Sequence, residues 1–178
     1  MTDPKAHYLR ILQAKYAYPD FPKPGVLFCN VTELLKEDGF LAHFLAEVDA
    51  LRPGLDFDCI AGIESRGFIW GAMAAARLGV PFVPIRKKGK LPGELISYSY
   101  TTEYSTDTLE IAMSDFRVPR KVLLVDDVIA TGGTLRASAQ LIRRAGSEVA
   151  GVFAILQIPG LGDVSEFRAV RTALFLPA

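Results

Sequence analysis

The sequence predicts an α/β fold in which helices flank a central, mostly parallel sheet. Short apolar runs typical of buried strands alternate with stretches of helical periodicity along most of the chain. Half of the 178 residues are hydrophobic and 22% are charged, which excludes intrinsic disorder and provides enough apolar material for a core. We therefore expect residues 1–178 to form one domain that binds ligands beyond the carboxyl ends of its parallel strands.

Three segments have the apolar spacing of helices that bury one face. They cover residues 40–51, 67–78 and 133–145. A Pro-Gly pair follows the first segment, and a glycine follows each of the other two, as expected where a helix ends. Short apolar runs predict strands over residues 57–61, 80–85, 108–113, 121–125, 149–156 and 172–176.

Two segments lack such a pattern. Residues 18–25, Tyr-Pro-Asp-Phe-Pro-Lys-Pro-Gly, contain three prolines, which fix φ and remove backbone donors. We therefore expect the N-terminal segment, to about residue 35, to form an extended hood rather than a helix. Residues 87–107 collect Lys, Gly, Pro, Ser, Thr and Tyr without periodicity, and a loop of this length is typical of a flexible lid.

Charge and hydropathy exclude several classes of protein. The 20 basic residues balance the 20 acidic ones, whereas a nucleic-acid-binding protein usually carries a basic excess. No apolar run approaches the ~18 residues of a membrane span. The first residues contain no apolar segment of a signal peptide, so we expect a cytoplasmic protein without a membrane or nucleic-acid partner. Two cysteines are too few for a disulfide framework.

The most informative stretch is residues 122–134, Val-Leu-Leu-Val-Asp-Asp-Val-Ile-Ala-Thr-Gly-Gly-Thr. It joins a buried strand, two acids, a loop of small residues and the start of a helix. Backbone N–H groups at a helix start bind anions, and Thr131 and Thr134 add hydroxyl donors. The carboxylates of Asp126 and Asp127 can accept hydrogen bonds from vicinal hydroxyls. The stretch therefore predicts a site for a ribose 5-phosphate.

Competing interpretations of this stretch fit less well. A P-loop requires a lysine after the glycines, and a dinucleotide site requires Gly-x-Gly-x-x-Gly after the first strand; the sequence has neither. The structural alternative is that the acids and glycines only turn a strand into a helix. Paired aspartates at a buried strand end are costly without a ligand, which favours the binding site.

Residues 122–134 resemble the phosphoribosyl-pyrophosphate signature of type I phosphoribosyltransferases. The resemblance runs from about Tyr18 to Ile155, and four further segments narrow it to the adenine phosphoribosyltransferase family: residues 20–28, 61–68, 85–92 and 100–111. It implies transfer of 5-phosphoribose from phosphoribosyl pyrophosphate to adenine, giving AMP and pyrophosphate. It also implies the type I fold with a small N-terminal hood and a lid, a Mg2+ cofactor and a homodimer.

The resemblance also implies a role for each motif. The 5′-phosphate would bind to Ala130, Thr131, Gly132, Gly133 and Thr134, and the ribose hydroxyls to Asp126 and Asp127. Pyrophosphate would bind to the loop Glu64, Ser65 and Arg66 and to Arg86, Lys87 and Lys90. Arg66 and Glu103 would be catalytic, Glu103 by stabilising a proton on the purine. From the residues alone, two alternatives remain open. Arg66 could form only a salt bridge at a helix start, and the charges of Glu103, Arg86, Lys87 and Lys90 could simply be solvated.

Base recognition is implied for Leu27, Phe28 and Cys29, with Phe28 as the stacking aromatic. Here the chain departs from the family, which commonly shows Arg-Asp where this sequence has Cys29-Asn30. Magnesium is expected to bind mainly through substrate oxygens, with Asp126 or Asp127 touching it through water, because no cluster of protein ligands is evident.

Two alternatives remain open. One is a phosphoribosyltransferase for another base, such as hypoxanthine or guanine, and Cys29-Asn30 keeps it open. The other is a non-catalytic regulator that uses this fold to sense phosphoribosyl pyrophosphate. Such a regulator would need a DNA-binding extension and a basic surface, whereas the net charge of this chain is zero.

Overall fold

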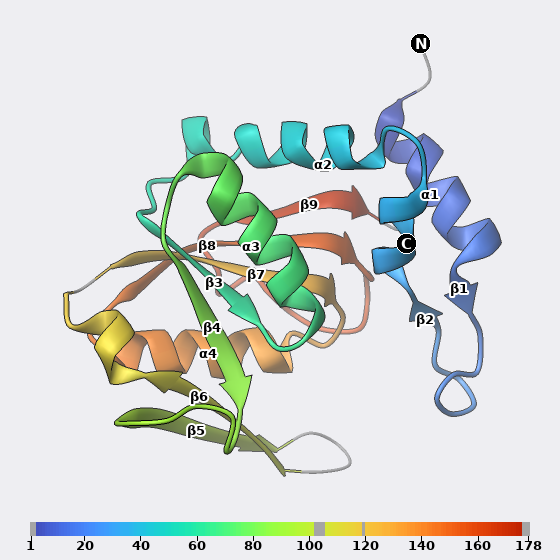
Figure 1. The fold of residues 1–178 in the computed structure, drawn as a ribbon. Coiled ribbons are helices and arrows are strands. Elements are labelled where there is room, and N and C mark those ends of the chain that lie inside the picture. The colour runs from blue at the N-terminus through green and yellow to red at the C-terminus, as the bar shows by residue number, and fades with distance from the viewer. Residues whose placement is uncertain (1–2, 102–105, 119, 176–178) are drawn as a thin grey trace.

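The computed structural model describes residues 3–101, 106–118 and 120–175 (Figure 1). Its helices are α1 (Pro4–Lys15), α2 (Phe40–Asp49), α3 (Arg66–Leu78) and α4 (Gly133–Arg144), with short 3-10 segments η1 (Val31–Lys36), η2 (Arg52–Gly54) and η3 (Met113–Phe116). Its strands are β1 (Ala17–Tyr18), β2 (Phe28–Cys29), β3 (Cys59–Ile63), β4 (Phe82–Lys87), β5 (Leu95–Thr101), β6 (Thr106–Ala112), β7 (Lys121–Ile129), β8 (Glu148–Gln157) and β9 (Val170–Phe175).

Seven of these strands form the central sheet of the described residues, in the order β5-β6-β4-β3-β7-β8-β9. The strands from β4 to β9 in this order are parallel, whereas β5 and β6 form an antiparallel pair at the β4 edge. The predicted α/β class with a mostly parallel sheet is therefore confirmed. The three predicted helices correspond to α2, α3 and α4.

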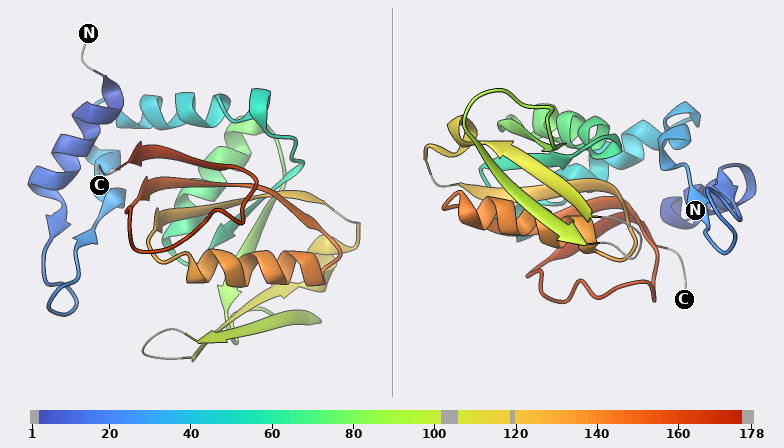
Figure 2. Two further views of the ribbon diagram at one scale, coloured as in Figure 1. Left: turned by 180° about the vertical axis from the view of Figure 1, so that it is seen from behind. Right: turned by 90° about the horizontal axis from the view of Figure 1, so that it is seen from below.

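Strand β7 divides the core into two layers. Alternate side chains of a strand point to opposite faces of the sheet. Leu123 and Val125 pack with Trp70 and the helices α2 and α3, whereas Leu124 packs with Ile142 of α4 on the other face. All of these side chains are fully buried. Figure 2 shows the result, with α2 and α3 on one face of the sheet and α4 on the other.

The N-terminal segment stands to one side of the sheet (Figures 1 and 2). The prediction of an extended hood without a helix is wrong for its first part, because residues 4–15 form α1. Asp3 caps this helix by accepting a hydrogen bond from the Lys5 N–H (3.0 Å), and Pro4 occupies the first turn, where a missing N–H costs little. The Asp-Pro pair was thus an available signal for a helix start.

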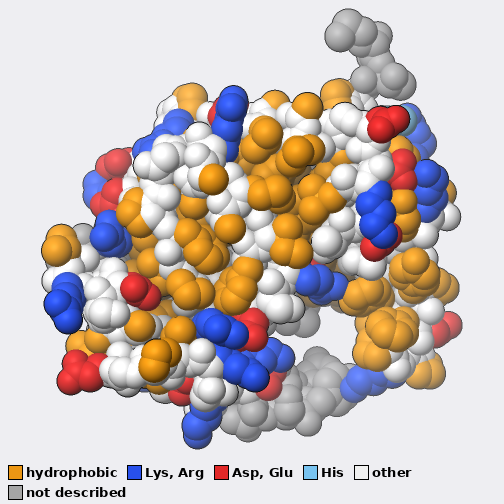
Figure 3. Space-filling view, in the orientation of Figure 1, with side chains coloured by type: hydrophobic (Ala, Val, Ile, Leu, Met, Phe, Trp, Pro, Cys, Tyr) orange, Lys and Arg blue, Asp and Glu red, His pale blue; other side chains and the backbone are white. Residues whose placement is uncertain are grey.

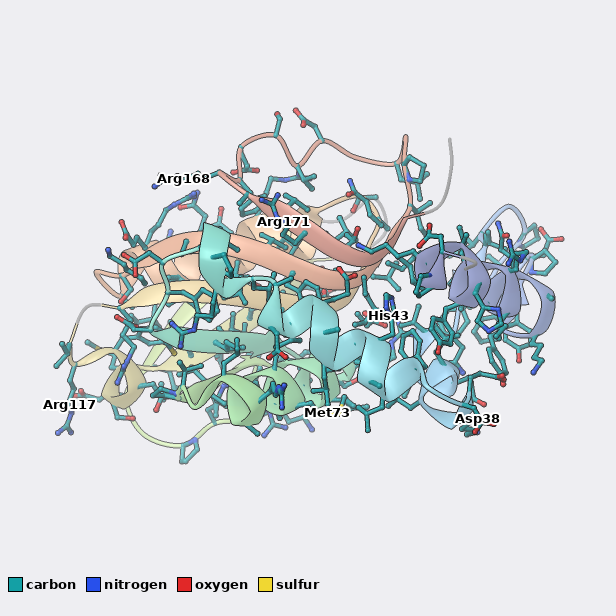
Figure 4. The ribbon with its side chains drawn as sticks, turned by 90° about the horizontal axis from the view of Figure 1, so that it is seen from above. Asp38, His43, Met73, Arg117, Arg168 and Arg171 are labelled. Carbon is teal, nitrogen blue, oxygen red and sulfur yellow. The ribbon has the colours of Figure 1, made fainter. Side chains whose placement is uncertain are left out.

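Helix α1 is attached to the rest of the molecule through aromatic side chains. Tyr8 stacks on His43 of α2 with ring centroids 5.3 Å apart, and it meets Phe40 edge-on at 5.0 Å. Its hydroxyl donates to the Asp38 carbonyl (3.0 Å). Figure 4 shows His43 on the part of α2 that lies nearest α1. These contacts fix the base of the segment that carries Phe28 on β2.

The prediction of a loop over residues 87–107 is wrong for residues 95–101 and 106–107, which belong to strands, whereas residues 88–94 form no strand or helix. Residues 95–101 form β5, which pairs with β6 from Leu95 opposite Ala112 to Thr101 opposite Thr106. The side chains at residues 96, 98 and 100 alternate with serines, so a period of two was present in a composition typical of a loop. Residues 102–105, and with them Glu103, lie outside the described residues.

No helix of the described part of the chain is both long and apolar enough to cross a bilayer.

The close approach of α3 to β7 depends on Gly67. A Cβ atom at this position would lie 2.8 Å from the Val125 carbonyl oxygen and 3.1 Å from Asp126 Oδ1. Strands β3, β4 and β7 end together at this edge of the sheet, so the contact sets the distance between the start of α3 and the end of β7.

We predict that Gly67→Ala lowers the free energy of unfolding by about 1–3 kcal/mol, because backbone atoms block the added methyl group. Alanine would otherwise stabilise a helix by ~1 kcal/mol relative to glycine. Gly71→Ala is the control, because the nearest obstacle there, 2.9 Å away, is a ring atom of the Phe82 side chain, which can turn. Urea denaturation should rank Gly67→Ala as the less stable variant; a Gly67→Ala protein more stable than the parent would contradict this packing.

Candidate functional site

A cavity of about 460 Å3 lies where β3 and β7 end. Its walls combine acidic, basic and hydroxyl side chains from five parts of the chain: Glu64, Ser65, Arg66, Lys87, Tyr100, Asp107, Leu109, Asp126, Asp127, Val128 and Thr134. A smaller hollow of about 80 Å3 shares Asp126, Val128 and Thr134 with it and is lined by the remaining residues of the turn from 128 to 135. The two hollows together form one site at the carboxyl ends of the parallel strands, as predicted.

Asp126 and Asp127 form the floor of this site. The Asp127 N–H donates to Asp126 Oδ1 (2.9 Å), and the Asp127 side chain is buried. Burial, followed by the neighbouring Asp127 carboxylate, raises the pKa of Asp126 well above its ordinary value. The pair is therefore unfavourable for folding and is poised for ligands that donate hydrogen bonds.

Arg66 connects the floor to the N-terminal segment. Its Nε lies 2.6 Å from Asp127 Oδ2, and its guanidinium carbon lies 5.0 Å from the centre of the Phe28 ring. The residue occupies the first turn of α3, immediately after Ser65, which is the N-cap residue. One guanidinium thus balances a buried carboxylate and contacts an aromatic face.

The turn from β7 into α4 surrounds the smaller hollow. Gly132 has φ +76° and is the N-cap residue of α4; because it has no side chain, it cannot accept hydrogen bonds from the first N–H groups of the helix. The Gly133 N–H donates to Thr131 Oγ1 at 3.5 Å. Arg136 stabilises the turn by donating to the carbonyl oxygens of Thr131 (2.9 Å) and Asp163 (2.7 Å). The start of α4 and the hydroxyl-bearing residues Thr131 and Thr134 line this hollow, which we call the cradle, and N–H groups at a helix start favour anions.

Two of the cations predicted to bind pyrophosphate differ in their contacts. Lys87 lines the cavity, whereas Arg86 turns back to Glu64, with its Nε 3.3 Å from Glu64 Oε2. Glu64 also accepts the Lys87 N–H (2.8 Å). Burial raises the pKa of Glu64, but these hydrogen bonds outweigh it and hold the pKa below its ordinary value. An ionised carboxylate cannot donate to an anion; in the structure Glu64 contacts Arg86 and the Lys87 backbone, and its predicted contact with pyrophosphate stays a prediction.

The three residues predicted for the base point in different directions. Phe28 is half-buried, lies beside Arg66 and meets Phe21 edge-on at 5.2 Å. Leu27 is exposed, and Cys29 packs into the core beneath α1 and α2. Burial raises the pKa of the Cys29 thiol, so this departure from the family places an unreactive apolar group away from the cavity.

Sequence reasoning missed three residues at the site. Tyr100 and Asp107 line the cavity, and the Tyr100 hydroxyl lies 3.3 Å from Thr134 Oγ1, which joins β5 to the cradle. Arg136 supports the cradle from below. The alternation along β5 was the available signal for Tyr100, whereas nothing in the sequence pairs Arg136 with Thr131.

A second cavity, of about 520 Å3, lies at the opposite ends of the strands and includes Arg52, Lys121 and Arg168. Figure 4 shows Arg168 on the side of the molecule away from the hood. Two of these cations are already engaged, because Lys121 pairs with Asp56 (2.5 Å) and Arg52 donates to the Phe57 carbonyl (3.0 Å). Most of the predicted phosphoribosyl-pyrophosphate residues line the cavity of about 460 Å3 or the hollow beside it, and none of them lines this one.

Comparison with known proteins points to the same site chemistry. Residues 41–172 match the family described as phosphoribosyl transferase domain. An adenine phosphoribosyltransferase from Photorhabdus laumondii is 48% identical over 160 residues, which cover 88% of this chain and 86% of the relative.

Solved structures agree with this relationship. The adenine phosphoribosyltransferase of Thermoanaerobacter pseudethanolicus superposes with a TM-score of 0.84 at 37% identity, covering 94% of this chain and 99% of the other. The Saccharomyces cerevisiae enzyme, solved with adenine and an imino-altritol bisphosphate, gives a TM-score of 0.80 at 33% identity, covering 93% and 97%.

We predict that Asp126→Asn raises the melting temperature at pH 7 by about 2–4 °C while turnover falls at least about a hundredfold. The folded-state pKa of Asp126 lies above its unfolded value, so the folded state binds an extra proton between the two values. Stability therefore falls as pH rises from about 4 through the raised pKa, and the asparagine removes this loss.

Asp115→Asn is the matched control, because burial also raises the pKa of Asp115, on η3 and outside the cavity. Melting curves across pH with parallel rate measurements should show stabilisation for both variants and lost turnover for Asp126→Asn alone. Full activity of the Asp126→Asn variant would show that this carboxylate has no role in the reaction.

Proposed function

The chain belongs to the adenine phosphoribosyltransferase family and transfers 5-phosphoribose from phosphoribosyl pyrophosphate to adenine, giving AMP and pyrophosphate, and we propose that it does so in the cavity floored by Asp126 and Asp127. The observation that carries the assignment of the site is the junction of the two carboxylates with the cradle at the start of α4. An anion cradle beside two hydrogen-bond acceptors is complementary to a 5-phosphate and the vicinal hydroxyls of a ribose.

The remaining parts of the substrate follow from this placement. With the 5′-phosphate on residues 130–134, the pyrophosphate group extends toward Ser65, Arg66 and Lys87 on the opposite wall. Arg66 also lies over Phe28, so the base stacks at the end of the cavity that faces the N-terminal segment. The reacting carbon then lies between the pyrophosphate cations and the base.

Catalysis at this site rests on electrostatic stabilisation. Departure of pyrophosphate leaves positive charge on the ribose, which the carboxylates of Asp126 and Asp127 stabilise, while Arg66 and Lys87 neutralise the leaving group. The base nitrogen then bonds to the ribose carbon, so no covalent nucleophile from the protein is required. We assign to Glu103 the stabilisation of a proton on the purine and to the β5–β6 hairpin the exclusion of water.

Magnesium belongs to the proposal as a cofactor. In the part of the chain that the structure describes, no group of three or more His, Cys, Asp or Glu side chains is placed to hold a metal ion. The two adjacent carboxylates nevertheless offer the oxygen ligands that Mg2+ prefers, and Asp126 or Asp127 would reach it through water. When bound through substrate oxygens, Mg2+ neutralises phosphate charge.

We also propose that two copies form a homodimer through the face built by α2 and α3. Leu41 and Ile69 are exposed there, and Figure 3 shows apolar side chains gathered over these two helices. Light scattering should then give twice the 19.4 kDa mass of one chain. The two cysteines are free and buried, which fits a reducing compartment such as the cytoplasm.

A panel of bases tests the function directly. Purified protein, magnesium and phosphoribosyl pyrophosphate are mixed with adenine, hypoxanthine, guanine, xanthine or uracil, and nucleotide and pyrophosphate are measured. We predict that AMP forms from adenine at least about a hundredfold faster than nucleotide forms from the other bases, because backbone groups near Phe28 recognise the purine edge.

Each other outcome has a definite meaning. If hypoxanthine or guanine is the preferred substrate, the change in base specificity would be attributed to Cys29-Asn30, where the chain departs from the family. Binding of phosphoribosyl pyrophosphate without turnover of any base would indicate a sensor.

A further inference from the structure

A buried carboxylate supports the cationic turn without lining the cavity. Glu110 lies in β6, is only 5% exposed, and stands opposite Arg86 of β4 and Ser97 of β5 in the sheet register. Burial of an ionised carboxylate is costly unless hydrogen bonds satisfy its oxygens. A buried acid on β6, one strand in from the β5 edge of the sheet, therefore needs hydrogen-bond partners.

Its hydrogen bonds lead to the turn after β4. Glu110 Oε2 accepts the N–H of Gly89 (2.8 Å), and Oε1 accepts the Ser97 hydroxyl (3.2 Å). Gly89 has φ +78°, a left-handed conformation that leaves its N–H facing the sheet. The carboxylate thus ties the turn to the hairpin strand β5.

Glu110 completes a row of three consecutive backbone anchors. The Lys87 N–H donates to Glu64 (2.8 Å), the Lys88 N–H to the Thr108 carbonyl (3.1 Å), and the Gly89 N–H to Glu110. The Lys90 carbonyl accepts from Arg86 Nη1 (3.4 Å). The N–H groups of residues 87–89 are thus engaged within the protein, which leaves the side chains of Lys87 and Lys90 as the cationic groups of the turn that can meet a ligand.

We propose that Glu110 is a positioning residue for pyrophosphate: by holding Gly89 it fixes the backbone from which Lys87 and Lys90 meet the leaving group. The inference rests on the proposed function, because Lys87 and Lys90 bind pyrophosphate only if the cavity accepts phosphoribosyl pyrophosphate. The role is distinct from catalysis, since the carboxylate touches neither the cavity nor the proposed position of the substrate.

Electrostatics and positioning predict opposite results when Glu110 is replaced. Removal of a negative charge near the turn strengthens the binding of an anion if charge alone matters. Loss of the acceptor for Gly89 weakens it if the carboxylate positions the lysines. The sign of the change therefore separates the two explanations.

The test measures pyrophosphate and AMP binding by calorimetry and the KM values of both substrates for three variants. We expect Glu110→Ala to weaken pyrophosphate binding and raise the KM for phosphoribosyl pyrophosphate about tenfold, with the KM for adenine within about twofold of the parent. Glu110→Gln keeps an oxygen that can accept the Gly89 N–H and should remain within about threefold of the parent. Ser97→Ala, which removes the other hydrogen bond, should resemble the parent.

Three results would overturn the proposal. These are tighter pyrophosphate binding by Glu110→Ala, an equal rise in both KM values, or a Ser97→Ala defect as large as that of Glu110→Ala. If Glu110→Ala does not fold, a pyrophosphate affinity of Glu110→Gln more than tenfold below the parent contradicts the role given to the Gly89 bond. Failure of the parent to form AMP would refute the proposed function instead, while pyrophosphate calorimetry would still test Glu110.

Discussion

The arrangement of the site depends on two adjacent carboxylates at the end of a buried strand. Asp126 and Asp127 repel one another, and burial makes their charge costly, so the fold must bring a cation and donors to them. The absence of a side chain at Gly67 permits α3 to approach, and Arg66 in the same turn then reaches Asp127. In our proposal the cost in stability is retained because the same acceptors bind the hydroxyls of a ribose.

Two further acids, Glu64 and Glu110, support the cationic turn near Asp126 and Asp127. Glu64 and Glu110 each accept a backbone N–H group from the turn that carries Lys87, but only Glu64 also lines the cavity. A carboxylate in contact with an anionic substrate would repel it, whereas one placed behind a cationic turn orients it. We propose that Glu110, which lies outside the cavity, assists the binding of a polyanion without touching it.

The sequence determined much of this picture because its strongest patterns are local. The run from Val122 to Thr134 specifies strand, turn and helix within thirteen residues, so its geometry follows without distant contacts. The helix over residues 4–15 is not predicted because a proline-rich segment follows it. Strand β5 is not predicted because its serine and threonine residues give it the composition of a loop. Tyr100 and Glu110 contact partners far away in sequence, and Arg136 reaches Asp163 as well as the nearby Thr131. The alternation along β5 predicts the strand that carries Tyr100, but a single sequence carries no signal of the partners themselves.

The most direct test of the account compares the affinities of AMP and adenosine by calorimetry at one ionic strength. The two ligands share the base and the ribose and differ only in the 5′-phosphate, which we place in the cradle of residues 130–134. The account predicts that AMP binds at least about a hundredfold more tightly, as charge-assisted bonds of about 1.5–3 kcal/mol to several N–H groups require. Equal affinities would show that the turn from β7 into α4 does not bind the phosphate, and the central assignment would fail.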